Sequence, residues 1–295
     1  MEPFAFKELQ QKLHGFVIKE PCYLQATDGI GLAYYSFVPD TPKAIVIFYH
    51  GAGFYSSQLY QFFAKQLADN HGIGCYLFDV RGHGNSQGPR GDTTSIAQVW
   101  DDVTSAVEIV NKEHPEIPLY LGGHSSGAGL ILNYSNYYDN SRISGYLFIA
   151  PYFGRNSGVN RDHLDPSASF VKSVSVWKFI VNALTRGYFC GHSPAVFFNY
   201  PEELLKSDSK IVKSYSVEMM AATSPESPQE LVAKLSKPFL LLVAENDEQF
   251  IPEKIFVYKN YAQGAIAKSS TAVIIPNAKH LDVMLKAAEC CAPFV

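Results

Sequence analysis

The chain has 295 residues, of which 47% are hydrophobic and 18% charged, as in ordinary globular proteins with a sizeable core. A formal net charge of -4 excludes a general attraction to nucleic acid. No apolar run approaches the roughly 20 residues that cross a bilayer, and five scattered cysteines are too few for a disulfide framework. The N-terminal sequence has no basic region followed by an apolar stretch, so we expect no secretory signal and a cytoplasmic location.

The first part of the chain predicts a hairpin and then strands that alternate with helices. Residues 16–37 are expected to form an antiparallel hairpin. The continuous apolar run at 44–49 is typical of a strand covered on both faces, and 75–79 has the same character. Apolar residues recur at helical spacing over 58–68 and 94–112.

The alternation is interrupted once in the second half of the chain. A strand is expected at 145–150, after which no buried-strand pattern occurs until about residue 227. The alternation resumes with a strand at 238–244, a helix at 252–262, a strand at 271–275 and a helix from about His280.

Strands that alternate with helices indicate a mostly parallel sheet flanked by helices on both faces. We therefore expect one α/β core made of residues 1–151 and 228–295. An inserted helical cap is expected at residues 152–227.

A candidate nucleophile lies where the apolar run that begins at Leu119 meets a helical pattern from Leu130. Gly123-x-Ser125-x-Gly127 fits the pattern of a nucleophile elbow, in which the serine occupies a strained turn. Glycine is needed on both sides because a side chain there would collide with neighbouring backbone. The following helix would direct its free N–H groups at the serine and favour negative charge there. A glycine-rich turn without chemistry is the alternative.

A serine hydroxyl needs a base, and the base needs an acid that fixes its tautomer. The expected strand at 238–244 is followed by Glu245, Asp247 and Glu248, and the strand at 271–275 is followed by His280. With Asp247 as the acid, the chain order is serine, acid, histidine, as this kind of elbow requires. The two glutamates remain alternative acids.

Five segments carry a resemblance to a known family: His50-Gly51-Ala52-Gly53, Phe78-Asp79-x-Arg81-Gly82-His83-Gly84-x-Ser86, Gly123-His124-Ser125-Ser126-Gly127, Ala244-x-x-Asp247 and Ala278-Lys279-His280-Leu281-Asp282. With them the chain resembles the α/β-hydrolases, and within these the monoglyceride lipase and lysophospholipase-like branch. The family usually has glycine where Ala244 stands.

The resemblance implies roles for five residues. Ser125 would be the nucleophile, Asp247 the acid and His280 the base, and the N–H groups of Ala52 and Ser126 would form the oxyanion hole. His50 and His83 lie in loops beside the site and are expected to support it by packing and hydrogen bonding, whereas His124, which precedes the nucleophile, is expected to line the elbow.

The expected activity is hydrolysis of carboxylic esters, with a small-molecule or lipid-like substrate of the monoacylglycerol or lysophospholipid type. No metal or organic cofactor is expected, and neither G-x-G-x-x-G nor G-x-x-x-x-G-K occurs. An acyltransferase, a peptidase or a carbon–carbon bond hydrolase would use the same triad. A ligand-binding protein that kept the fold and lost turnover is the non-enzymatic alternative.

The expected cap contains an apolar helical face of Phe170, Val174, Trp177, Val181 and Leu184. Such a face either packs on the core or forms an acyl pocket or lipid-facing lid. Basic residues outnumber acidic ones between residues 152 and 200, which would favour transient contact with an anionic membrane surface.

Overall fold

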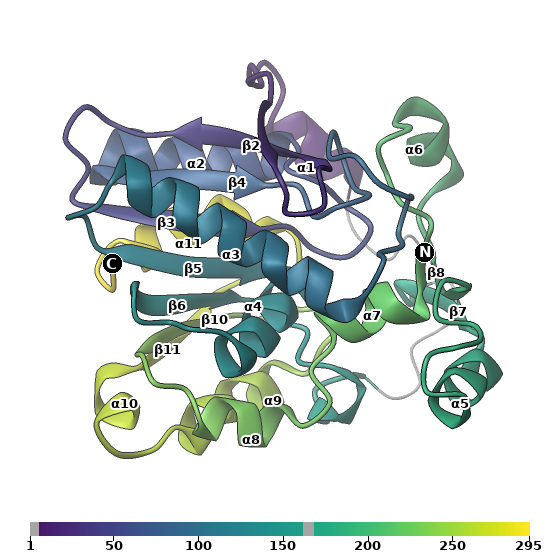
Figure 1. Cartoon of the computed structure of the whole chain (residues 1–295). Helices are drawn as coiled ribbons and strands as arrows, with labels where there is room; N and C mark the ends of the chain where they lie inside the picture. Colours follow the sequence, from purple (N-terminus) through teal and green to yellow (C-terminus); the bar gives the residue numbers. More distant parts are fainter. Residues whose placement is uncertain (1–5, 162–167) are drawn as a thin grey trace.

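The computed structural model describes residues 6–161 and 168–295, and an eight-stranded sheet runs through them (Figure 1). Its strands, in spatial order, are β1 (Cys22–Gln25), β2 (Gly31–Phe37), β4 (Ile73–Phe78), β3 (Ala44–Tyr49), β5 (Leu119–His124), β6 (Ile143–Ile149), β10 (Phe239–Ala244) and β11 (Thr271–Ile275). β1 and β2 pair antiparallel, as does β2 with β4, and the pairs from β4 to β11 are parallel. The predicted mostly parallel sheet is confirmed.

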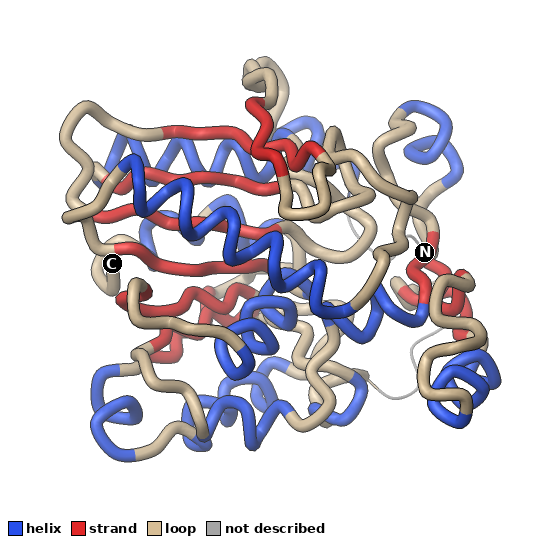
Figure 2. Tube along the Cα trace, in the orientation of Figure 1, coloured by secondary structure: helices blue, strands red, loops and turns tan. Residues whose placement is uncertain are grey.

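The central strands are apolar throughout because both faces of the sheet are covered. Every residue of β3, β4 and β10 is buried. Helices α3 (Ile96–Glu113) and α4 (Ser126–Tyr137) lie on one face, and α2 (Gln58–His71) and α11 (Ala287–Cys291) lie on the other (Figures 1 and 2). The hydrophobic core lies in the two layers between the sheet and these helices.

Shorter helical segments complete the part of the chain outside residues 152–227: α1 (Phe6–Lys12), α8 (Pro228–Ala233), α9 (Pro252–Phe256), η2 (Val257–Tyr261), α10 (Gly264–Ser269) and η3 (Asp282–Leu285). The predicted helix at 252–262 is therefore an α-helix followed by a 3-10 helix. The helix expected from His280 begins two residues later, also as a 3-10 helix. No helix of the described residues is both long and apolar enough to cross a membrane.

The predicted hairpin begins later than expected. Residues 16–18 lie outside β1, and Val17 is 85% exposed. Pro21 directly precedes β1 and cannot donate a ladder hydrogen bond, which is consistent with a strand that starts only at Cys22.

Residues 152–227, called here the inserted segment, contain strands as well as helices. Its described part, without residues 162–167, contains η1 (Arg155–Ser157), β7 (Val171–Val174), α5 (Val176–Leu184), β8 (Pro194–Phe198), α6 (Glu202–Ser207), β9 (Ser214–Ser216) and α7 (Val217–Thr223). β7, β8 and β9 form an antiparallel sheet at the end of the molecule where α5 and α6 lie (Figure 1). The segment predicted as a helical cap thus contains a small sheet in addition to its helices.

The apolar helical face predicted from Phe170 to Leu184 is also shorter than expected. Val174 belongs to β7 and Phe170 precedes that strand, so α5 begins only at Val176. β-branched residues at 171 and 174 favour the extended chain. No residue of α5 is buried, and thus this helix does not pack its apolar face into the core.

Candidate active site

Ser125 occupies a sharp turn between β5 and α4. Its backbone has φ 53 and ψ -118, a combination that costs a residue with a side chain on the order of 1–3 kcal/mol. The turn is held by the Ser125 N–H, which donates to the carbonyl of Ile149 at 3.0 Å, and by its carbonyl, which accepts from the Tyr152 N–H at 3.0 Å. The side chain is partly exposed, in contrast to its buried neighbours His124 and Ser126.

The glycines on either side of Ser125 are required by close backbone contacts. A Cβ atom on Gly123 would lie 2.2 Å from the carbonyl carbon of Gly127. A Cβ atom on Gly127 would lie 2.4 Å from the carbonyl oxygen of Tyr49. These contacts let α4 approach β3 and β5 closely enough to form the turn.

The two residues expected to supply oxyanion-binding N–H groups lie at the start of α4 and in the loop after β3. Ser126 is the first residue of α4, so its N–H has no acceptor within the helix and sits at the positive end of the helix dipole. The loop after β3 passes the same place, since a Cβ on Gly51 would lie 3.3 Å from the Cβ of Ser125. Ala52 is the next residue of that loop.

His280 and Asp247 meet at the ends of β11 and β10. Nδ1 of His280 and Oδ2 of Asp247 are 2.8 Å apart, and their side chains are 3% and 0% exposed. The other oxygen of Asp247 accepts from the N–H groups of Gln249 and Phe250, each at 2.9 Å. Because a carboxylate only accepts here, the imidazole carries its proton on Nδ1, which leaves Nε2 able to act as a base.

The two neighbouring glutamates contact the backbone of the histidine loop. Oε2 of Glu248 accepts from the main-chain N–H of His280 at 2.8 Å. Oε2 of Glu245 accepts from the N–H of Asn277 at 2.7 Å, and Glu245 is exposed. Of the three candidate acids, Asp247 is thus the one whose carboxylate pairs with the imidazole of His280.

The pKa of His280 reflects these neighbours. Burial disfavours the imidazolium, but the charge of Asp247, the hydrogen bond to it and the charge of Glu248 outweigh burial and raise the pKa. A base with a raised pKa accepts a proton more readily in the transition state.

His124 connects the loop after β3 to the histidine loop. Its Nε2 lies 2.9 Å from the carbonyl oxygen of His280, so Nε2 donates and Nδ1 is left to accept. The hydroxyl of Tyr60 lies 2.9 Å from Nδ1 and itself accepts from the Gly51 N–H at 2.9 Å. The sequence predicted only that His124 lines the elbow, and Tyr60 carried no sequence signal.

The other motif histidines are buried and lie among hydrogen-bonding groups. Nε2 of His50 accepts from the Val80 N–H at 3.1 Å. Nδ1 of His83 donates to the carbonyl of Arg81 at 2.9 Å. Burial lowers the pKa of both rings, which keeps them neutral. Among residues 6–161 and 168–295, no cluster of three or more His, Cys, Asp or Glu side chains is arranged to hold a metal ion.

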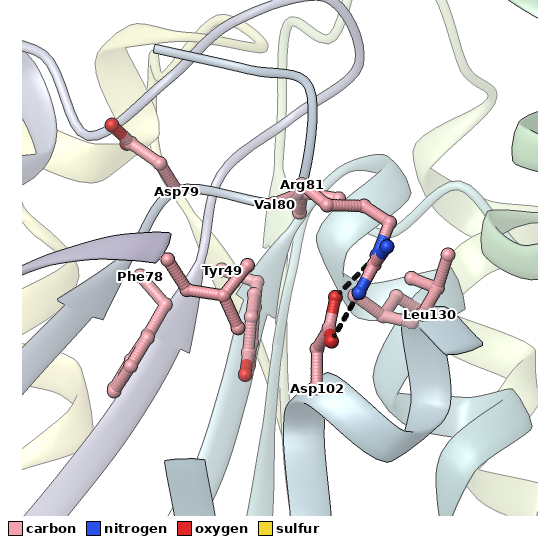
Figure 3. A pocket seen from close by; sticks show the side chains of 9 residues that line it. Tyr49, Phe78, Asp79, Val80, Arg81, Asp102 and Leu130 are labelled. Carbon is pink, nitrogen blue, oxygen red and sulfur yellow. Dashed lines mark hydrogen bonds and ion pairs between the residues drawn. The ribbon is translucent and has the colours of Figure 1, made fainter. Parts of the chain in front are cut away.

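A small cavity beneath the loop after β4 lies outside this group of residues. It measures about 10 Å³, roughly the space of one water molecule, and Figure 3 shows Arg81 and Asp102 facing each other at its wall. Nε of Arg81 donates to Asp102 at 2.6 Å, and Nη1 donates to Asp28 at 2.9 Å. A cavity of this size is too small to admit an ester.

Comparisons with known proteins agree with the geometry. A family model described as "Serine aminopeptidase, S33" matches residues 40–283. The chain is 30% identical over 133 residues to a monoacylglycerol lipase of Mycolicibacterium smegmatis, an alignment that covers 45% of this chain and 46% of that protein. It is 27% identical over 216 residues to the monoglyceride lipase of Homo sapiens, covering 70% of this chain and 66% of that protein.

The matched part spans less than half of the mycobacterial relative, and 26% of a putative monoglyceride lipase of Schizosaccharomyces pombe. In the fold comparison, a soluble variant of monoglyceride lipase from Saccharomyces cerevisiae aligns with a TM-score of 0.70 and 19% identity, over 95% of this chain and 96% of that chain. At this identity the likeness supports the fold alone. The family match over residues 40–283, together with this fold, shows that the chain belongs to the serine aminopeptidase S33 family of α/β-hydrolases.

Proposed function

We propose that this protein is a serine hydrolase that cleaves carboxylic esters through an acyl-enzyme. The observation that carries the proposal is the buried hydrogen bond between His280 and Asp247, in a chain whose Ser125 occupies a strained turn. The bond from the His124 ring to the His280 carbonyl ties the histidine loop to the residue that precedes the serine.

In this proposal Ser125 Oγ attacks the ester carbonyl carbon while Nε2 of His280 takes the hydroxyl proton. Asp247 holds Nδ1–H and stabilises the imidazolium. The C–O bond to the leaving alcohol then breaks, and His280 gives its proton to that alcohol. Water, deprotonated by His280, then attacks the acyl carbon. The bond from that carbon to Ser125 Oγ breaks, the acid is released, and His280 returns its proton to Ser125 Oγ.

The N–H groups of Ala52 and Ser126 would bind the oxyanion of both tetrahedral intermediates. Each such donor contributes about 3–4 kcal/mol in the transition state. Both are backbone groups at fixed positions, one on the loop after β3 and one at the start of α4. Little reorganisation is then needed when charge develops.

We infer a lipid-like substrate from the relatives named monoacylglycerol or monoglyceride lipase and from the exposed apolar surface of the inserted segment. Trp177 is 59% exposed, Leu184 80% and Tyr188 82%. Lys172 and Lys178 lie on β7 and α5 beside them. We propose that residues 152–227 act as a cap on a core of 1–151 and 228–295. This apolar and basic surface would make transient contact with a lipid interface.

The activity is tested with the purified protein and a panel of acyl esters, monoacylglycerols and lysophospholipids of increasing chain length. We expect ester turnover that rises with acyl length, with the acid and the alcohol as products. Amino-acid anilides and added acyl acceptors belong in the same panel. Cleavage of anilides alone, or acyl transfer without hydrolysis, would replace the proposal with a peptidase or an acyltransferase.

Interface contact is tested by flotation with vesicles of phosphatidylcholine and phosphatidylglycerol. We expect wild type to float and the Trp177→Ser/Leu184→Ser variant to lose most of that binding. Val17→Ser/Tyr23→Ser is the matched control, because Val17 and Tyr23 are equally exposed but lie outside the inserted segment. Equal flotation of the two variants would contradict the proposed contact.

A further inference from the structure

The loop that carries Ala52 is held by residues of the inserted segment. The hydroxyl of Tyr200 donates to the carbonyl of Ala52 at 2.7 Å. The hydroxyl of Tyr215 accepts from the N–H of Gly53 at 3.0 Å, and the Val212 N–H donates to the Gly53 carbonyl at 2.8 Å. The three partners all come from the inserted segment, and they lie about 150 residues further along the chain.

The two tyrosines hold a single peptide unit. The carbonyl of Ala52 and the N–H of Gly53 belong to the same planar group and point to opposite sides of it. One hydroxyl binds each side, so rotation of this plane breaks at least one of the two bonds. The orientation of this plane fixes ψ of Ala52 and φ of Gly53, which has the left-handed value of +68.

The preceding peptide unit, which carries the Ala52 N–H, is held from the core. Its carbonyl, that of Gly51, lies 2.9 Å from Nδ1 of His50 and accepts from the Phe54 N–H at 3.2 Å. In a trans peptide the Ala52 N–H must point away from these donors. The core and the inserted segment thus each fix one of the two peptide planes that meet at Ala52.

The hydroxyl of Tyr215 is itself fixed in direction. Because Nδ1 of His83 donates to a carbonyl, Nε2 must accept, and it lies 2.9 Å from the Tyr215 hydroxyl. Tyr215 therefore donates to His83 and accepts from Gly53. The side chain is 1% exposed, and the rings of Phe198 and His83 pack against it at centroid distances of 4.9 and 5.2 Å.

We propose that Tyr200 and Tyr215 are positioning residues: by holding the peptide unit that follows Ala52, they keep in place the loop that carries the oxyanion-binding N–H of Ala52. When the inserted segment is packed on the core, the oxyanion hole would be complete. Displacement of the segment would loosen the loop that carries Ala52. This inference rests on the proposed hydrolase function. The two hydroxyls should also order the peptide between Ala52 and Gly53 whether or not the protein turns over an ester.

The test compares Tyr200→Phe, Tyr215→Phe and the double variant with Tyr258→Phe. Tyr258 is the matched control, because its buried hydroxyl also joins the core to the inserted segment, by donating to the Ser157 carbonyl at 2.8 Å, but makes no bond to the loop that carries Ala52. We expect each loop variant to lower kcat about tenfold with KM within about twofold, since a transition-state contact is weakened and ground-state binding is not. Affinity for an alkyl trifluoromethyl ketone, which forms a tetrahedral oxyanion adduct, should fall in parallel.

Hydrogen–deuterium exchange of the peptide that covers residues 48–56 supplies a second readout, independent of activity. Exchange should rise in Tyr215→Phe and Tyr200→Phe and stay unchanged in Tyr258→Phe. If wild type is active and the loop variants match Tyr258→Phe in both kcat and exchange, this inference is overturned and the proposed function is not. Inactive wild type would overturn the proposed function, and exchange would still decide whether the tyrosines order the loop.

Discussion

Nδ1 of His280 lies 2.8 Å from Oδ2 of Asp247, and both side chains are buried at the carboxyl ends of adjacent parallel strands. The aspartate does not depend on the histidine for its orientation, because two backbone N–H groups, of Gln249 and Phe250, hold its other oxygen. A carboxylate held in this way can select one imidazole tautomer and stabilise its protonated form.

Replacing Asp247 with asparagine should keep the fold and lower kcat about 10⁴-fold, because an amide can stabilise the wrong tautomer and supplies no charge. Steady-state ester hydrolysis measures the loss. Glu245→Gln is the control, since Glu245 is exposed and its bond goes to the Asn277 backbone. A larger loss in Glu245→Gln than in Asp247→Asn would show that Asp247 is not the acid.

The pH dependence of kcat/KM should show an acid limb set by His280. The neutral imidazole is the active form, and the raised pKa of His280 places the midpoint above the usual value of about 6.5. Activity is therefore lost as the pH falls through this raised pKa. In Glu248→Gln the amide oxygen still accepts from the His280 N–H, but the charge is gone, so the midpoint should move to lower pH. A midpoint that stays in place would show that Glu248 does not influence the titrating group.

Gly123→Ala should destabilise the protein by several kcal/mol, because the new methyl group meets the Gly127 backbone at 2.2 Å and neither chain segment can yield. Chemical denaturation monitored by circular dichroism measures the change in the free energy of unfolding. Gly191→Ala is the control, since its Cβ would meet only flexible side chains, of Asn182 and Glu218, at 3.3 Å. Equal stability of the two variants would show that the elbow tolerates a side chain.

The two carboxylates that bind Arg81, Asp102 and Asp28, should contribute unequally to the free energy of unfolding. Asp102→Asn leaves Arg81, which is 1% exposed, without its main counter-charge, and a loss of about 3–5 kcal/mol in the free energy of unfolding is expected. Asp28→Asn removes the partner that is 27% exposed and should cost less. Thermal and urea unfolding of each variant measure the two losses. The reverse order would contradict this description of the pair.

The parts of the fold that sequence predicted best are those dictated by burial on both faces. β3 and β10 are apolar at every position, and their predicted limits differ from the structure by at most one residue. The strands of the inserted segment escaped prediction because they have three to five residues, too few for a period to emerge. The exposed valines of β7 also resembled part of the neighbouring helical pattern.

The candidate site divides in a similar way. The serine turn carries a local sequence signal, since Gly123 and Gly127 lie two residues before and two residues after Ser125 in the sequence. The choice between Asp247 and its glutamate neighbours depends on how the loop after β10 folds, which local sequence does not encode. Tyr200 and Tyr215 approach Ala52 and Gly53 only through tertiary structure, and aromatic residues are common in such a segment.

In the proposed mechanism Ser125 is the nucleophile of a triad with His280 and Asp247. The most direct measurement is covalent labelling by a fluorophosphonate, with ester turnover followed in the same samples, for wild type, Ser125→Ala and the exposed-serine control Ser207→Ala. We predict that wild type and Ser207→Ala are labelled at residue 125 and turn over ester, and that Ser125→Ala is unlabelled with turnover reduced about 10⁴–10⁶-fold. Labelling of another residue, or turnover in Ser125→Ala equal to that of wild type, would contradict the claim.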